Sequence, residues 1–262
     1  MKRKFVGTHE EYLELQKSYI SKSKGRTGKP CTPKIVFAHQ RAEMDYMLFR
    51  SRFWRYRRYI DCSKKAVLLG ARLGTEVRAL RDLGHQNCIG MDVQIEYAND
   101  PTLVEYGDFM DLKYEDNSIQ FAYTNCLDHL LEPSGFIDGL ERSMEHNGFA
   151  LLDVDTQHRS GRGFSGWDMY EPASVDELLE CFTGNNRHIV SIEESLQPFE
   201  GGGLSVMMKF GEVPNEYEKE WSNIAKSYVM EKQTFECADA TNSALFGEAS
   251  LGDKLNRGDS IT

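Results

Sequence analysis

The stretch AVLLGARLGTEVRAL, residues 66–80, decides the fold of this chain. An apolar run over 66–69 leads into a short turn that holds Gly70 and Gly74, and a helical pattern follows, with Thr75 placed to cap it. Glycines let the backbone turn tightly and approach a ligand closely. The helix start beyond them offers free N–H groups and a partial positive charge. A strand, a glycine turn and a helix in this order predict a site for a nucleotide-like ligand.

The turn alone does not distinguish a ligand site from an ordinary connection, because Arg72 stands where a Gly-x-Gly-x-x-Gly loop has its middle glycine. Asp92 supplies the supporting evidence. It ends the next apolar run and follows Gly70 by roughly 20 residues, the distance at which a carboxylate can accept hydrogen bonds from both hydroxyls of a ribose. The alternative is an aspartate that caps the turn after its strand. The preceding loop favours the ribose role.

Apolar runs and helical patterns alternate after residue 65, which predicts parallel strands joined by helices. We expect strands at 66–69, 88–91, 103–106, 118–124, 149–154, 188–193 and 204–210, and helices at 9–20, 40–60, 76–83, 134–146 and 214–232. These elements divide the chain into a basic helical extension over 1–60, a ligand-binding α/β domain over 61–212, and a C-terminal helix with a flexible tail over 213–262.

Charge is distributed unevenly along the sequence. Residues 1–65 carry 17 Lys and Arg against 6 Asp and Glu, although the whole chain has a net charge of −10. The basic part can bind an anionic partner such as a nucleic acid, or it can dock on the acidic remainder of the chain. We favour docking, because single basic clusters are common surface features.

The cysteines and the apolar runs indicate the compartment. The six cysteines are scattered without a Cys-x-x-Cys pair, which predicts neither a metal site nor a disulfide framework. Cys88 and Cys126 are expected in the core as reduced thiols. No apolar run approaches the roughly 18 residues that cross a bilayer, and no apolar stretch follows the basic N-terminus. We therefore expect a cytoplasmic protein without a membrane partner.

The segment 66–154 resembles the class I S-adenosylmethionine-dependent methyltransferases. The matching pieces are VLLGARLGTE, IGMDV, YGDFMDLKYEDNSIQFAYTNCLDHL and NGFALLDVD. The third piece is the most specific, because Gly-Asp, then Asp-Asn-Ser, then an apolar strand and a histidine follow the order of the family. The resemblance implies an α/β fold, a Rossmann-like three-layer sandwich. Its sheet would be mostly parallel and seven-stranded, with helices on both faces and helical extensions at both ends.

The resemblance also implies S-adenosyl-L-methionine as the cofactor. An adenine amino group suits a carboxylate acceptor, and the flat face of the ring suits apolar neighbours. The expected cofactor-binding residues are Gly70, Ala71, Arg72 and Gly74 near the methionine part, Asp92 at the ribose with Val93 next to it in sequence, Asp108 and the backbone N–H of Phe109 at the adenine, and Asn125, followed by Cys126 and Leu127, near the sulfonium.

The chain departs from the family at two positions. Leu68 stands where the family usually has an acid that helps to hold the amino group of the methionine part. Arg72 replaces the middle glycine, and its guanidinium can pair with the cofactor carboxylate or brace the loop against Asp92, Glu76 or another acid. The sequence leaves both roles open. The chain resembles a variant of the family that carries the loop Leu-Gly-Ala-Arg-x-Gly-Thr-Glu-Val.

The expected function is methyl transfer to a small-molecule or sugar-like acceptor. His129, after the fourth strand, is the candidate general base, with Asp128 placed to orient it; the alternative is a structural histidine. The glycine-rich segment 156–172 is either a lid over the acceptor or a surface loop with packed aromatics. Two other functions stay open. One is a nucleic-acid or protein methyltransferase that uses the basic helix Arg41–Arg58, and the other is a non-catalytic S-adenosylmethionine-binding protein.

Overall fold

The computed structural model describes residues 2–3, 8–14, 34–130, 133–155, 170–171, 175–184, 186–195 and 203–212. These residues all fall within the first of the chain's two compact units, Met1–Ala225. The predicted helix at 214–232, the C-terminal tail and most of the predicted lid lie outside the described residues. Among the described helices, none is long and apolar enough to cross a membrane.

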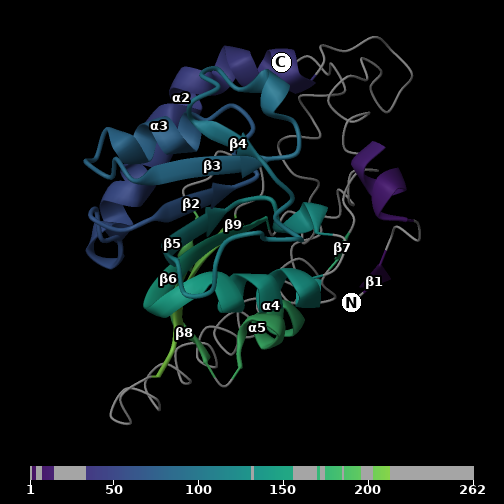
Figure 1. Ribbon diagram of the computed structural model, residues 1–262, viewed down its shortest axis with the longest axis vertical. Helices are drawn as coiled ribbons and strands as arrows, with labels where there is room; N and C mark the ends of the chain where they lie inside the picture. Colours follow the sequence, from purple (N-terminus) through teal and green to yellow (C-terminus); the bar gives the residue numbers. More distant parts are fainter. Residues whose placement is uncertain are drawn as a thin grey trace, which may run out of the picture. The chain divides into compact units, whose positions relative to one another are not determined.

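A seven-stranded sheet forms the centre of the domain (Figure 1). Its strands are β2 (Ala66–Leu69), β3 (Cys88–Asp92), β4 (Val104–Tyr106), β5 (Ile119–Thr124), β6 (Met144–Asp155), β8 (Arg187–Glu194) and β9 (Gly203–Phe210), in the spatial order β4-β3-β2-β5-β6-β9-β8. The first five strands are parallel to one another, whereas β9 is antiparallel to both β6 and β8. The predicted α/β class and strand number are confirmed, and the sheet is mixed because its last two strands form an antiparallel pair.

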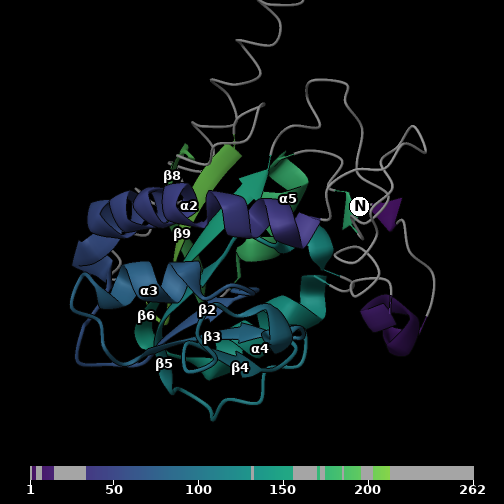
Figure 2. The same ribbon diagram turned by 90° about the horizontal axis from the view of Figure 1, so that it is seen from above.

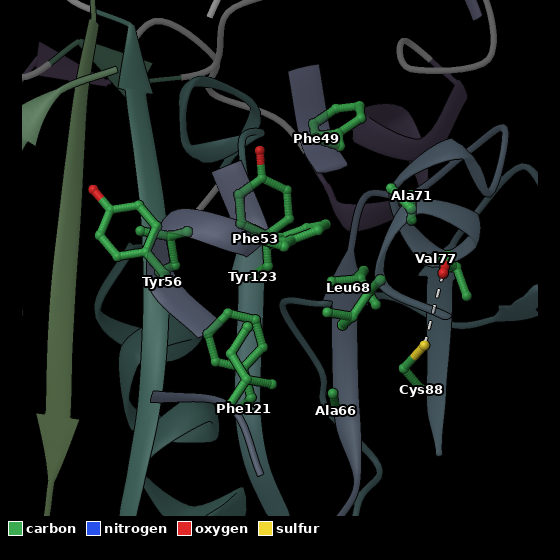
Figure 3. Packing of buried hydrophobic residues seen from close by; sticks show 14 of the residues in the cluster. Phe49, Phe53, Tyr56, Ala66, Leu68, Ala71, Val77, Cys88, Phe121 and Tyr123 are labelled. Atoms are coloured by element: carbon green, nitrogen blue, oxygen red, sulfur yellow. Dashed lines mark hydrogen bonds between the residues drawn. The ribbon is translucent and has the colours of Figure 1, made fainter. Parts of the chain in front are cut away.

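Helices cover the sheet. On one face lie α2 (Lys34–Tyr56), which continues into the short helix η1 (Arg57–Tyr59), and α3 (Thr75–Arg81); the two longer helices lie side by side in Figures 1 and 2. Phe53 of α2 is fully buried and packs edge-on against Phe121 and Tyr123 of β5 (Figure 3). The N-terminal region therefore supplies part of the main core.

The other sheet face is equally apolar. Successive strand side chains point to opposite faces, so Val67 and Ala122, which are both buried, point away from α2. Helix α4 (Pro133–Ser143) buries Phe136 and Leu140, and α5 (Val175–Phe182) packs against α4. A separate two-stranded sheet joins β1 (Lys2–Arg3) to β7 (Tyr170–Glu171).

Three predicted boundaries are wrong. Helix α2 begins at Lys34, before the predicted start at residue 40, and α4 ends at Ser143 because Met144 already pairs with Ile119 across the sheet. Gly74, in a left-handed conformation, is the N-cap of α3, and Thr75 is its first helical residue without a side-chain cap. The predicted stop at Gly84 agrees with its positive φ of 100° just after α3.

A buried ion pair connects α2 to the sheet. Arg52 Nη1 lies 2.8 Å from Asp153 Oδ2, and both side chains are almost fully buried. Arg52 also donates a hydrogen bond to the Tyr123 hydroxyl at 2.7 Å, and that hydroxyl donates to Asp153 at 2.7 Å. Arg55 pairs with Glu193 of β8. At these positions the basic helix docks on acids of the domain, as the favoured reading of the charge asymmetry predicts.

Candidate ligand-binding site

The parallel strands bring the predicted residues to one edge of the sheet. Gly70 follows β2, Asp92 ends β3, Asp108 follows β4 and Asn125 follows β5. The register places Leu69 opposite both Met91 and Thr124, and Asp92 opposite Tyr106. The carboxyl ends of these four strands therefore lie next to one another, at the edge where open α/β sheets bind ligands.

The turn after β2 requires its glycines. Gly70 and Gly74 have φ values of +78° and +72°, which side chains rarely adopt. The Gly70 N–H donates to the Met91 carbonyl at 2.8 Å, so the turn is held against β3. A Cβ at Gly70 would lie 2.6 Å from the Cys126 Sγ, closer than any real contact. The turn thus keeps bare backbone at the strand ends, and Ala71 within it is buried.

Asp92 is buried at the end of β3, and one of its oxygens accepts a hydrogen bond from the Gln94 backbone N–H at 2.8 Å. Burial raises the pKa of Asp92, and the nearby Arg72 charge opposes that shift. Gln94 is only 1% exposed, yet neither its amide oxygen nor its amide nitrogen has a partner within the described part of the chain. Buried amides normally find partners, so this unsatisfied group beside Asp92 fits a polar ligand.

The adenine positions predicted from the sequence lie after β4. The Asp108 Oδ1 accepts the Met110 backbone N–H at 2.9 Å, which leaves Oδ2 on the other side of the carboxylate. The His9 Nε2, from the short helix over residues 9–14, lies 3.2 Å from that Oδ2. Phe109 is buried, with its ring edge-on to Phe136 of α4 at 5.9 Å, so its side chain belongs to the core.

The segment after β5 completes the edge. Asn125 is half-buried, and its Oδ1 lies 3.3 Å from the Cys126 Sγ. Cys126 is half-buried against Gly70, so its predicted place in the core is wrong, whereas Cys88 is buried as expected. His129 ends the short helix η3 (Leu127–His129). Its interaction with Asp92 favours the ionised form of the Asp92 carboxylate. The side chain of Asp128 lies outside the description.

Two charged residues, Arg72 and Glu76, lie in the glycine loop and in the helix turn that follows it. Arg72 is half-buried, its Nε is buried without a hydrogen-bond partner, and no acid among the described residues lies within 4 Å of its guanidinium. Of the two roles that the sequence leaves open for Arg72, the brace is therefore not formed as a close ion pair with a described acid. Val93, after Asp92, is half-buried. Glu76, in the first turn of α3, is buried beside these groups; the sequence named it only as a possible partner of Arg72 and did not single out Gln94.

No family model and no curated protein matches the sequence. Solved structures do match the fold, and methyltransferases are among them. Geranyl diphosphate C-methyltransferase from Streptomyces coelicolor, in complex with Mg²⁺, geranyl diphosphate and S-adenosyl-L-homocysteine, matches with a TM-score of 0.53 at 11% identity, over 79% of this chain and 100% of that chain.

Two further structures agree. A chain of the complex between the Haloferax volcanii Trm112 methyltransferase activator and its methyltransferase partner matches with a TM-score of 0.53 at 17% identity, over 68% of this chain and 97% of its own. A Methanosarcina mazei S-adenosylmethionine-dependent methyltransferase matches with a TM-score of 0.50 at 14% identity, over 60% and 97%. At these identities the likeness shows the Rossmann-like methyltransferase fold and no acceptor.

Proposed function

We propose that this chain is a methyltransferase that binds S-adenosylmethionine at the carboxyl edge of β2, β3, β4 and β5. The observation that carries the proposal is the convergence there of the glycine turn, Asp92 and Asp108, together with buried polar atoms that lack partners in the described part of the chain. Fold likeness to known methyltransferases adds support.

The groups present suit each part of the cofactor. Asp92 accepts hydrogen bonds from the ribose hydroxyls, and the unpaired amide of Gln94 offers a further donor and acceptor beside it. The Asp108 Oδ2, which lies 3.2 Å from the His9 Nε2, accepts from the adenine amino group. Val93 and the Phe109 backbone border the ring. The turn with Gly70, Ala71, Arg72 and Gly74 receives the methionine part, and Asn125 lies toward the sulfonium.

The cofactor, when bound, supplies an activated methyl group and a thioether leaving group. The chain's own contribution is to hold the acceptor atom in line with the methyl carbon and to exclude water. His129, half-buried at the end of η3, is the candidate to take the acceptor's proton when that atom carries one. No tighter role is assigned to His129, because the acceptor decides whether a base is needed.

Calorimetric titration of the full chain with S-adenosylhomocysteine tests the cofactor site. The Asp92→Ala protein should lose two charge-assisted hydrogen bonds and bind at least ~100-fold more weakly. Asp111→Ala, which removes an exposed carboxylate near Asp108, is the matched control and should bind like wild type. Equal affinity of Asp92→Ala and wild type would remove the ribose assignment.

We propose a small-molecule or sugar-like methyl acceptor first. The exposed surface of α2 supports a second candidate, a macromolecular acceptor. Its outer surface exposes Met44, Met47 and Trp54, and Arg57 lies over the Trp54 ring at 4.2 Å. An exposed aromatic and basic surface of this kind suits a macromolecular acceptor such as a nucleic acid. RNA or DNA binding that weakens steeply with salt and is lost in Trp54→Ala would favour that candidate. A mass-spectrometric screen for methylated products separates both from a protein that only binds the cofactor.

A further inference from the structure

A buried carboxylate at the glycine loop lacks a partner of opposite charge. Glu76 follows Gly74 by two residues, and its side chain is 9% exposed. Across the described ranges no cation lies within 4 Å of it, and its hydrogen bond comes from its own backbone N–H. Removing a carboxylate from water without a compensating cation is strongly unfavourable. A side chain in this state indicates a missing cationic partner or a retained proton.

The charges around Glu76 are mostly negative. Asp92 faces it from β3, Asp45 from α2 and Tyr123 from β5, while the positive charge of Arg72 opposes them. Asp45 is itself paired with Arg41 at 2.8 Å. Burial raises the pKa of Glu76 to about 7, with Asp92 and Asp45 adding to the shift and Arg72 opposing it. A positively charged ligand group would be stabilised here.

We propose that Glu76 binds the α-ammonium of the cofactor's methionine part and that Arg72 binds the adjoining α-carboxylate. The proposal rests on the proposed function and names which side chains recognise the amino-acid end. An α-amino acid group carries one positive and one negative charge a short distance apart. The loop offers Arg72 and the first turn of α3 offers the buried acid Glu76, four residues further on, and neither has an oppositely charged partner within 4 Å among the described residues.

Position 68 cannot supply this acid. Leu68 is fully buried in the hydrophobic core between β2 and α2, where it packs with Phe121 and Val77 (Figure 3). Glu76 lies at the loop end of that core, close to Arg72 and Asp92. The chain therefore has no acid at the strand position, Leu68, and has one on the first turn of α3, Glu76.

The proposal predicts that binding is linked to a proton. A bound ammonium favours ionised Glu76, so a ligand with this group should release part of a proton from the protein near pH 7. 5′-Methylthioadenosine shares the adenosine and thioether of S-adenosylhomocysteine and lacks the amino acid. It should bind without this proton release.

The experiment is calorimetry of the full chain at neutral pH with both compounds, each in phosphate and in Tris, whose ionisation enthalpies differ. In Glu76→Gln, affinity for S-adenosylhomocysteine should fall by at least ~10-fold and the buffer-dependent proton release should vanish. Affinity for 5′-methylthioadenosine should stay unchanged. Arg72→Met should show the same selectivity in affinity, and Glu115→Gln, which changes an exposed acid, should match wild type in both titrations.

Each outcome bears on one of the two proposals. Equal weakening of both compounds in Glu76→Gln, or weakening of neither, overturns the role of Glu76. Unchanged S-adenosylhomocysteine affinity in Arg72→Met overturns the role of Arg72. Failure of wild type to bind either compound overturns the proposed function itself, and this inference with it. Thermal unfolding of each variant checks that it is folded.

Discussion

Replacing Glu76 by glutamine should stabilise the ligand-free chain by an amount that grows with pH. Burial raises the pKa of Glu76 from its ordinary 4.5 to about 7, so between these values the folded chain keeps a proton that the unfolded chain has released. Well below pH 4.5 the carboxyl is protonated in both states and carries no penalty. As the pH rises, folding loses about 1.4 kcal/mol per pH unit, and the penalty levels off at ~3 kcal/mol above pH 7.

The assay is urea unfolding of wild type and Glu76→Gln from about pH 4.5 to about pH 8, without ligand. Taking the difference between the two proteins isolates Glu76, because the other groups titrate in both. The variant and wild type should have nearly equal free energies of unfolding at the acidic end. At the basic end the variant should be more stable by ~3 kcal/mol. The exposed control Glu115→Gln should differ from wild type by a constant. A pH-independent difference for Glu76→Gln would refute the burial argument.

Two further substitutions test the loop and the core. Gly70→Ala should lower stability by at least ~1–2 kcal/mol and weaken S-adenosylhomocysteine binding, because φ is +78° and the new Cβ meets the Cys126 Sγ. Adding Cys126→Ala should recover the part of the stability loss that the sulfur causes, as a double-mutant cycle would measure. No recovery would contradict that contact. Asp153→Ala should lower the free energy of unfolding in urea by ~3–5 kcal/mol, because Arg52 is left buried without its carboxylate partner. The control Asp116→Ala removes an exposed ion pair and should lower it far less. Equal losses would contradict the difference in burial.

Much of the fold is encoded in local patterns. Each apolar run became a strand, and Asp92, Asp108 and Asn125 meet Gly70 because each lies at or just beyond the end of a parallel strand. The antiparallel direction of β9 was missed because apolar runs look alike in either direction. The short connection from β8 to β9 was the signal available.

The polar interior depends on contacts that are distant in sequence. The sequence presents Glu76 only as a possible partner of Arg72, and its burial follows only when α2 packs over α3. Gln94 reads as a loop residue, and its loop returns to the glycine turn through the Asn99 N–H, which donates to the Leu73 carbonyl at 3.1 Å. Rules of periodicity and spacing describe neither contact. The buried charge of the site could therefore be recognised only in the structure.

A crystal structure of the full chain with S-adenosylhomocysteine tests the central claim most directly. The account predicts the ribose hydroxyls on the Asp92 carboxylate, the adenine amino group on Asp108 in place of His9, and the amino-acid end between Glu76 and Arg72. A ligand bound away from the carboxyl ends of β2, β3, β4 and β5, or no bound ligand at saturating concentration, would contradict it.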